Sequence, residues 1–320
     1  MTRPTTVSGT IVIALGGNAL QPPGERVTIH DQFRHTRESL AAVVGLARDG
    51  WHIALVHGNG PQVGDALDRN ELARDRVEPL PLGVLVSATA GWIGYMVQQS
   101  LQNALERAGV PRQVLTAITQ TEVVESAAEL EPVKPIGHVL HEGELERYRA
   151  AGVPVGRDGA ERWRRLAPSP TPVDVVEWPA VRQLVAEGKI VVAAGGGGSP
   201  VYRHATLGWE GVDAVVDKDR VAAILGSRLG ADTLLILTDV DAVYAEWGTP
   251  AQRPLRRLSA REAEALLAGE GLGKGSMRPK VEAAVSFVRA GGARAVIAHL
   301  GDGPAALRGE TGTTILGDER

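Results

Sequence analysis

The chain has 320 residues, of which 43% are hydrophobic and 22% are charged, an ordinary balance for a globular protein. Its net charge of −4 gives no support for non-specific binding to nucleic acid or to an acidic membrane. Cysteine is absent, which excludes disulfides and thiolate chemistry and fits a cytoplasmic location. We expect no secretory signal and no transmembrane helix, because no apolar run approaches about 18 residues.

The first third of the chain alternates short apolar runs with helical patterns. Residues 10–15 form an apolar run that stops at two glycines and predict a buried strand. The spacing of apolar residues then predicts one helix over residues 29–48, a strand over 51–56 and a helix over 61–74. A long helix over residues 84–105 and one strand over residues 113–124 follow.

Residues 125–168 break this rhythm and predict a small insertion carried on the main sheet. The segment contains two turn-rich stretches, KPIGH and PVGRDG, and a basic run, RWRR. A disordered loop is the alternative interpretation. The basic run is more typical of a solvated or packing face of the insertion than of a nucleic-acid patch.

The remainder of the chain again alternates strands and helices. We expect strands over residues 190–194, 233–237, 294–298 and 313–316, a hairpin over 201–209, and helices over 217–229, 259–268 and 279–290. This order predicts an α/β protein, a three-layer α/β/α sandwich with a mainly parallel central sheet and a small protruding insertion. We expect an N-terminal lobe over residues 1–205 and a C-terminal lobe over residues 206–320.

Three glycine-rich loops follow predicted strands: GGN at residues 16–18, GNG at 58–60 and GGGG at 195–198. Ligands bind at the carboxyl ends of parallel strands, where glycine loops present backbone N–H groups to anions. The three loops together predict a shared anion site. For any one loop, the alternative is that glycine is needed only for packing. The P-loop pattern is absent, as is GxGxxG on the first strand, which excludes a Walker-type NTPase and a GxGxxG dinucleotide binder.

Four lysines are candidates for holding a phosphate, because phosphoryl transfer needs positive charge around the migrating group. They are Lys134, Lys218, Lys274 and Lys280. The alternative for Lys218 is that Asp217 caps the helix and the lysine is an exposed first-turn residue. For Lys134 and Lys280 the alternative is a place on the surface.

Acidic residues and histidines leave several interpretations open. Asp219 either orients the lysines, holds a metal ion, or is a first-turn acid that favours its helix. Asp239 and Asp241 either belong to a site or form an Asx turn. The eight histidines show no metal-ligand spacing, and we expect His57 to pack or hydrogen-bond beside its loop. No residue is predicted as a metal ligand.

Taken together, these motifs resemble carbamate kinase within the amino-acid-kinase fold family. The resemblance covers residues 10–316 and rests on IVIALGGNAL, LVHGNGPQVG, KPIG, WRRLAPSP, AAGGGGSPV, GVDAVVDKDRVAAILGSRLGAD, LLILTDVDAVY and GSMRPKVEAA. GGN and the LLILTDVDAVY segment are shared by the wider family, which includes acetylglutamate, aspartate and UMP kinases. HGNGPQVG, GGGG, VDKD and GSMxPK are more specific to carbamate kinase.

The resemblance implies a role for each matching residue. The substrate and phosphoryl site would be lined by Gly16, Gly17, Asn18, Gly58, Asn59, Gly60, Gly195, Gly196, Gly197 and Gly198. The transferred phosphate would be neutralised by Lys134, Lys218 and Lys280, with Asp219 aligning the lysines. The nucleotide would lie near Asp239, Val240, Tyr244 and Met277.

The implied reaction is reversible phosphoryl transfer between carbamoyl phosphate and ADP, with Mg²⁺ accompanying ATP or ADP, in a cytoplasmic homodimer of arginine metabolism. Three positions depart from the family pattern: Ala242 and Arg278 replace glycines, and residues 89–91 read TAG where SQG is common. Arg278 is expected to add charge near the nucleotide. The alternative functions are another small-acid kinase of this family and a catalytically weak nucleotide or metabolite sensor.

Overall fold

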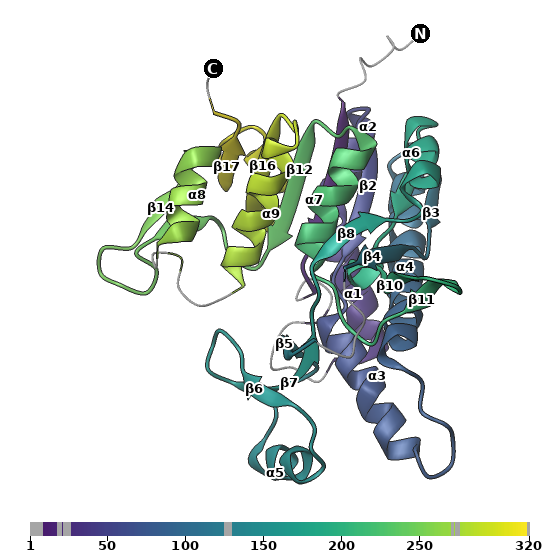
Figure 1. The fold of residues 1–320 in the computed structure, drawn as a ribbon. Coiled ribbons are helices and arrows are strands. Elements are labelled where there is room, and N and C mark those ends of the chain that lie inside the picture. The colour runs from purple at the N-terminus through teal and green to yellow at the C-terminus, as the bar shows by residue number, and fades with distance from the viewer. Residues whose placement is uncertain are drawn as a thin grey trace.

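An eight-stranded sheet forms the centre of the computed structural model (Figure 1), which describes residues 9–17, 21, 27–124, 130–269, 272 and 276–318. Its strands, in spatial order, are β15 (Arg257–Ser259), β17 (Thr313–Leu316), β16 (Arg294–His299), β12 (Thr233–Thr238), β1 (Thr10–Leu15), β2 (His52–His57), β9 (Ile190–Val192) and β3 (Val114–Thr116). Only β16 and β17 pair antiparallel among these neighbours. The predicted mainly parallel sheet is confirmed.

Helices cover both faces of this sheet, which gives the expected three layers (Figure 1). One layer contains α6 (Trp178–Ala186), α7 (Lys218–Leu229), α8 (Ala260–Ala268) and α9 (Met277–Arg289). The other contains α1 (Ile29–Ser39), α2 (Ala41–Arg48), α4 (Leu82–Arg107) and α10 (Gly303–Leu307). Among the described residues, no helix has the length and apolarity needed to cross a membrane.

Strand β1 shows why its sequence is apolar at every position. Ile11 and Ile13 point into the core on one face of the sheet, whereas Val12 and Ala14 point into the core on the other. Successive side chains alternate between the faces of a strand, so a strand covered on both faces requires a continuous apolar run. Burial of these side chains stabilises the sheet by about 25 cal/mol for each Å² of apolar surface removed from water.

The register of the central strands brings their carboxyl ends to one edge. Leu15 at the end of β1 lies opposite Leu237 of β12 and opposite His57 of β2. The chain segments that follow these strands therefore emerge side by side. This alignment places two of the glycine loops next to each other.

The insertion is a folded subdomain that lies below the carboxyl ends of the strands in Figure 1. It consists of β5 (Pro132–Ile136), α5 (Glu142–Ala150), β6 (Val155–Arg157) and β7 (Trp163–Pro168), with β7 between the other two strands. Its own small core contains Leu140, Leu145 and Tyr148. The disordered-loop alternative is thus wrong for residues 130–168.

A second contact attaches the insertion to α3 (Gly60–Ala73), the helix that projects from the body in Figure 1. Ile136 and Ala167 of the insertion are buried in one cluster with Val63 and Leu67 of α3. The amide of Gly137 also donates to the carbonyl of Gly60 over 3.0 Å. The two elements therefore pack together as a unit beside the site.

Smaller sheets complete the fold. A four-stranded sheet has the order β11 (Gly208–Gly211), β10 (Ser199–His204), β4 (Gln120–Val123) and β8 (Pro172–Val175). A hairpin joins β13 (Val243–Ala245) to β14 (Arg253–Leu255), and two short 3-10 helices are η3 (Gly195–Gly197) and η4 (Leu300–Asp302). The expected hairpin near residues 201–209 is confirmed as β10 and β11.

Two predicted elements were each wrong in one respect. The predicted single helix over residues 29–48 is two helices, interrupted at Leu40. The predicted strand over residues 113–124 is two short strands, β3 and β4, in different sheets. The chain leaves the first sheet at Thr119, whose side chain accepts from the amide of Ala194 and whose carbonyl accepts from the amide of Ser199. The division into lobes at residue 205 stays a prediction.

Gly64 tests the contact between α3 and the insertion. A Cβ atom at this position would come within 1.9 Å of the Gly137 Cα atom, which belongs to the backbone and cannot move alone. We expect Gly64→Ala to separate the insertion from α3 and to speed amide hydrogen exchange over residues 130–168. Gly45→Ala is the matched control, because it also lies in a helix and nothing lies within 4 Å of its Cβ position. The control should gain roughly 0.5–1 kcal/mol of stability. Unchanged exchange in Gly64→Ala would contradict the packing described here.

Candidate active site

Two glycine loops meet at the carboxyl edge of the sheet. The amide of Gly16 donates to the carbonyl of Leu237, and the amide of Gly58 donates to the carbonyl of Leu15, both over 3.0 Å. A Cβ atom on Gly58 would lie 2.9 Å from the backbone nitrogen of Gly17. Only glycine allows the two loops to approach this closely, so both predicted loops lie together as expected.

The third glycine loop joins them through its second residue. Gly196 has φ of +69°, and a Cβ atom there would lie 2.3 Å from the Asn59 side-chain nitrogen. The other three glycines of this loop face His57, Val216 and Thr121, and only Gly196 of the four lines a described cavity. A ligand contact by Gly195, Gly197 or Gly198 stays a prediction.

Asn59 is held in place by Thr89, which the sequence analysis noted only because residues 89–91 depart from the family pattern. The Asn59 amide donates to the hydroxyl of Thr89 over 3.0 Å, and that hydroxyl donates to the carbonyl of Val86 over 2.9 Å. Asn59 and Thr89 are both buried. Thr89 therefore fixes the orientation of the amide. Asn18, predicted to belong to the same site, lies outside the described residues.

Asp219 is the central charge of the site. One of its oxygens accepts from Lys218 Nζ over 2.5 Å, and the other accepts from Lys280 Nζ over 3.1 Å. Asp219 is only 2% exposed, and Lys280 is 8% exposed. Asp219 contacts both lysines, as expected of a residue that orients them, and it also lies in the first turn of α7. The alternatives of an exposed Lys218 and a surface Lys280 are wrong.

The charges of this cluster depend on each other. Burial alone would raise the pKa of Asp219, but Lys218 and then Lys280 hold that pKa below its ordinary value. Burial lowers the pKa of Lys218 despite Asp219. Burial also opposes the charge of Lys280, yet Asp219 and Asp217 raise the pKa of that ammonium group. The cluster is thus built to keep Asp219 ionised in a buried place.

Lys134 reaches the same site from the insertion. Its Nζ atom lies 3.1 Å from Oδ2 of Asp217 and donates to the carbonyl of Val216 over 3.1 Å. Asp217 also caps α7, because its other oxygen accepts from the amides of Asp219 and Arg220. The predicted capping role of Asp217 is correct, and the surface alternative for Lys134 is wrong. Lys274 lies outside the described residues.

Two adjoining cavities meet at these lysines. One, of about 170 Å³, is lined by Gly16, Gly17, Lys218, Thr238, Asp239, Ser276, Lys280 and Leu300. The other, of about 210 Å³, includes Asn59, Gly60, Lys134, Arg164, Gly196 and Asp219. Gly17, Lys218 and Lys280 line both. The arrangement can hold one anion in each cavity with the two lysines between them.

Arg164 is a site residue that sequence reasoning missed. It lines the larger cavity and is largely buried, and its Nη2 atom donates to the carbonyl of Gly137. Its Nε atom is buried without a hydrogen-bond partner among the described residues. The basic run RWRR was the available signal, but alternation along β7 decides which of its arginines faces the cavity.

The four residues predicted to lie near the nucleotide differ in whether they line a cavity. Asp239 lines the smaller cavity, whereas Val240, Tyr244 and Met277 are absent from the described lining residues. Tyr244 instead donates to Asp241 over 2.8 Å and contacts the ring of Trp247 edge-on. A nucleotide contact by Val240, Tyr244 or Met277 stays a prediction.

Two departures from the family pattern have structural explanations. Arg278 does not line either described cavity. It donates to the carbonyls of Leu267 and Gly269 at the end of α8, as a helix C-cap does, and added charge beside the nucleotide stays a prediction. Ala242 is fully buried and does not have a positive φ, so the backbone there does not require glycine.

His57 packs beside its loop, as expected. Its Nδ1 atom lies 3.0 Å from the carbonyl of Gly58, and the ring lies against Gly195. Burial lowers the pKa of His57 to about 4, so the imidazole is neutral at physiological pH. The site therefore offers fixed ammonium groups and backbone amides for an anion, an arrangement suited to phosphoryl transfer by positioning and electrostatics.

Comparisons with known proteins agree with this geometry. Residues 9–299 match the model of the amino acid kinase family. A carbamate kinase of Escherichia coli O6:H1 is 43% identical over 308 residues, covering 96% of this chain and 99% of that protein. The structure of a Giardia lamblia carbamate kinase bound to citric acid superposes with a TM-score of 0.91 at 34% identity, covering 97% of this chain and 99% of the other. A structure of carbamate kinase from Giardia lamblia bound to AMP-PNP has a TM-score of 0.86 at 33% identity, with 97% and 99% of the two chains covered.

The match to the family model covers most of the chain, and the similarity to the individual proteins covers nearly all of it. The glycine loops and the lysine–aspartate cluster lie inside the matched residues. The chain belongs to the amino acid kinase family and, within it, to the carbamate kinases.

Proposed function

We propose that the chain catalyses reversible phosphoryl transfer between carbamoyl phosphate and ADP, giving ATP and carbamate. One observation carries this proposal: two cavities share a wall made by Gly17, Lys218 and Lys280. A phosphoryl group that passes between two bound molecules needs positive charge at the point of passage and little covalent help. The two buried ammonium groups supply that charge, and Asp219 fixes their positions.

No described side chain that lines the two cavities is poised as a general base, which fits an acceptor that is already ionised. Carbamate is an oxyanion at neutral pH and needs no deprotonation. His57 is neutral, buried and turned to its own loop, and Asp219 is engaged by two lysines. The larger cavity, at about 210 Å³, also favours a small acceptor over one with a long side chain. Asn59, Lys134 and Arg164 are the side chains that would orient it.

The nucleotide is assigned to the smaller cavity, which Asp239 lines. The related Giardia lamblia enzyme bound to AMP-PNP supports a nucleotide ligand. Mg²⁺ prefers oxygen ligands and usually binds through one or two carboxylates together with substrate phosphates. Asp239 fits that role, whereas the oxygens of Asp219 are taken by lysines. When bound, the ion would neutralise phosphate charge.

A homodimer is part of the proposal, and the exposed surface near β3 supports it. β3 is the edge strand of the large sheet, and Leu115 on it is more than a third exposed. Ile118, just after β3, and Tyr95 on α4 are also about half exposed. Apolar side chains at an unpaired sheet edge favour association with another chain. We assign this face to a second copy.

The purified chain should make ATP from ADP and carbamoyl phosphate in the presence of Mg²⁺. Acetyl phosphate should be a poorer donor. ATP is measured by luciferase, with a reaction lacking carbamoyl phosphate to detect adenylate kinase activity. ATP formation no greater than in that control would exclude the proposed function. Faster phosphorylation of acetylglutamate than of carbamate, compared by kcat/KM, would favour another small-acid kinase.

Lys218→Ala should lower kcat by roughly 10²–10³-fold, because the transferred phosphate loses about 3–4 kcal/mol of electrostatic stabilisation. Lys189→Ala is the control, since Lys189 bonds Gln113 and lines neither described cavity. Thermal unfolding of both variants separates catalysis from stability. An activity loss that only follows a fall in Tm would assign Lys218 a structural role.

Lys134→Ala should raise KM for carbamoyl phosphate and lower kcat while leaving the binding of ADP alone nearly unchanged. The reason is that Lys134 lines the larger cavity and is absent from the described lining of the smaller one. Calorimetry measures ADP binding and the coupled assay measures KM. Wild-type kinetics in this variant would show that Lys134 does not contribute charge to the reaction.

A further inference from the structure

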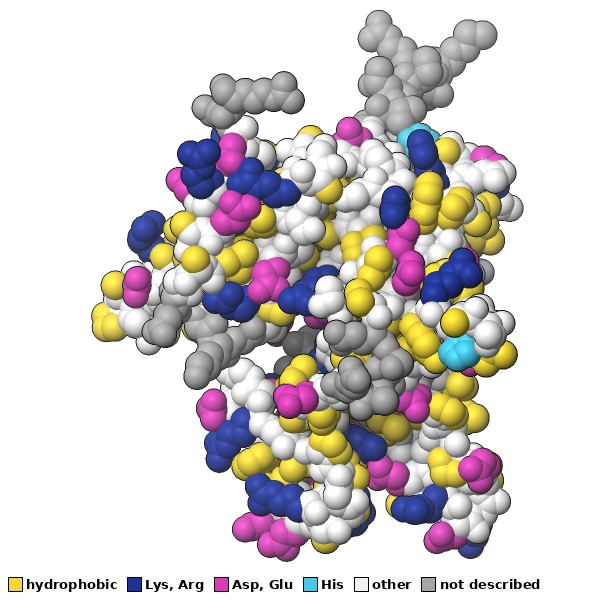
Figure 2. Space-filling model, viewed as in Figure 1, with side chains coloured by type: hydrophobic (Ala, Val, Ile, Leu, Met, Phe, Trp, Pro, Cys, Tyr) yellow, Lys and Arg dark blue, Asp and Glu magenta, His cyan; other side chains and the backbone are white. Residues whose placement is uncertain are grey.

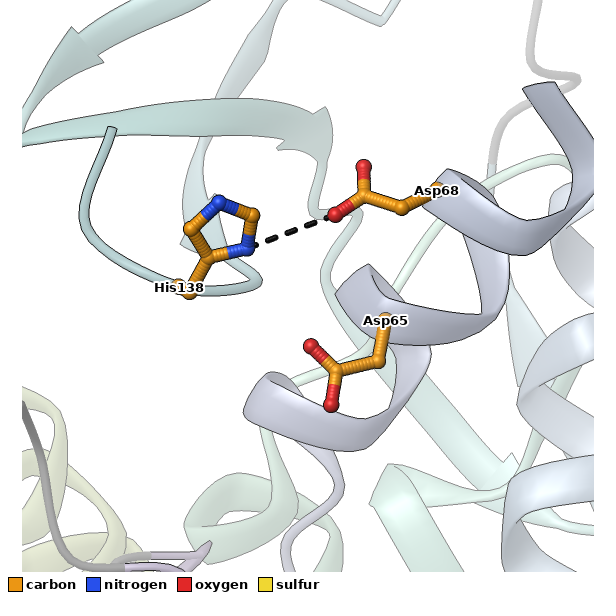
Figure 3. Close-up of side chains that lie close together, drawn as sticks. All are labelled: Asp65, Asp68 and His138. Carbon is orange, nitrogen blue, oxygen red and sulfur yellow. Dashed lines mark ion pairs between the residues drawn. The ribbon is translucent and has the colours of Figure 1, made fainter. Parts of the chain in front are cut away.

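A group of side chains outside the two cavities lies where α3 faces the insertion. Asp65 and Asp68 lie one turn apart on α3, and His138 follows β5 of the insertion (Figure 3). One ligand atom from each residue lies within 4.8 Å of the other two. All three residues are partly buried. Their side chains converge from two elements that are about seventy residues apart in sequence.

The spacing of the nearest pair fits a shared metal ion. His138 Nδ1 lies 3.3 Å from Oδ2 of Asp68, which is long for a hydrogen bond to a charged group. Ligands at about 2.0–2.2 Å in a tetrahedron around Zn²⁺ are separated by about 3.4 Å. The observed separation is therefore close to one edge of such a tetrahedron. A carboxylate oxygen of Asp65 lies within 4.8 Å of both ligand atoms, so Asp65 would close in on the ion as the third ligand, and a fourth position would be left for water.

The residues that hydrogen-bond to His138 and Asp68 are arranged as they are around bound metal ions. His138 Nε2 lies 3.1 Å from Oε1 of Glu144, and Glu144 is itself held by the amide of His141 over 3.1 Å. The Tyr148 hydroxyl donates to the other oxygen of Asp68. In metal sites, the second ring nitrogen of a ligating histidine usually donates to a carboxylate, and ligating carboxylates are themselves hydrogen-bonded. Nδ1 of His138 is thus the nitrogen that faces the two aspartates.

The surroundings of Asp65 differ from those of Asp68. Among the described residues Asp65 forms no ion pair, whereas Asp68 pairs with His138 and the nearby Glu71 pairs with Arg165. The charge of Arg69 and a hydrogen bond from Gln21 also act on Asp65. A cation bound between Asp65, Asp68 and His138 would give the Asp65 carboxylate an ionic partner.

We propose that Asp65, Asp68 and His138 bind one divalent transition-metal ion, with Zn²⁺ as the probe, and that the ion joins α3 to the insertion. A nitrogen with two carboxylate oxygens suits Zn²⁺ and similar ions better than it suits Mg²⁺ or Ca²⁺. Zinc would replace a purely ionic link between His138 and the two carboxylates by bonds of fixed length.

The ion would act on the same short segment that carries Lys134. Lys134 and His138 are four residues apart, and Gly137 between them bonds Gly60 at the start of α3. Fixing His138 to α3 would therefore restrict the strand that carries Lys134 toward the cavity. This consequence rests on the proposed function, but the binding of the ion does not.

The test is calorimetric titration of Zn²⁺ into the tag-free, nucleotide-free full chain. We expect one ion per chain, and at least tenfold weaker binding by Asp65→Asn and by His138→Gln. Asp75→Asn and His30→Gln are matched controls on exposed residues and should bind as the wild type does. Glu144→Gln should weaken Zn²⁺ binding by about 10–100-fold, because Glu144 is the carboxylate that faces the second ring nitrogen of His138. Co²⁺ should give a visible absorption band that Asp65→Asn loses.

Two results would overturn the site: no Zn²⁺ binding by the wild type, or equal binding by the wild type, Asp65→Asn and His138→Gln. Either would leave an ionic link of His138 with Asp68 and Glu144. Thermal unfolding shows whether the variants fold, and Asp65→Asn removes no ion pair. Zn²⁺ should also slow hydrogen exchange over residues 130–168 in the wild type only. If the wild type binds Zn²⁺ but the ion changes neither hydrogen exchange over residues 130–168 nor the KM for carbamoyl phosphate, the ion does not join α3 to the insertion. Absence of kinase activity would bear on the proposed function alone.

Discussion

The buried carboxylate of Asp219 is the constraint on which the site depends. An ionised carboxylate away from water costs several kcal/mol unless it is paired and hydrogen-bonded. Lys218 and Lys280 meet that requirement, one on each oxygen. The pairing with Asp219 also holds Lys218 of α7 and Lys280 of α9 at the shared wall of the two cavities. With Lys134 and Asp217 included, three ammonium groups and two carboxylates leave a net charge of about +1. A bound phosphate therefore balances a cluster that the protein alone leaves positive.

Much of this arrangement could be predicted from the sequence because its causes are local. Apolar runs that stop at glycine indicate buried parallel strands, and parallel strands bring their carboxyl ends to one edge. That reasoning placed the loops after β1 and β2 together, and the structure agrees. The pairing of Lys280 with Asp219 is a contact between α9 and α7, which are far apart in sequence. No spacing within one segment indicates it. The residues alone left it as one of several interpretations of Asp219, and the resemblance singled it out.

What the sequence did not reveal depends on packing between distant segments. Arg164 lines the cavity because the insertion packs on α3 beside the site, and that packing cannot be read from the basic run itself. The hydrogen bonds of Arg278 to the end of α8 were not foreseen either, because chain proximity to Lys280 says nothing of where a long side chain turns. The grouping of Asp65, Asp68 and His138 likewise appears only when the insertion packs on α3. On the face of the molecule shown in Figure 2, charged side chains of both signs are scattered among uncharged ones.

The central position of β1 has a consequence for how the chain is made. This strand lies between β2 and β12, and residue 11 pairs with residue 233. During synthesis β1 therefore keeps one edge unpaired until β12 has been made. At about 5–20 residues per second, that interval lasts on the order of ten seconds or more. An apolar strand with an open edge is prone to join another chain. Nascent chains of this protein are thus expected to need protection by chaperones during synthesis, before Lys280 has joined the other site lysines.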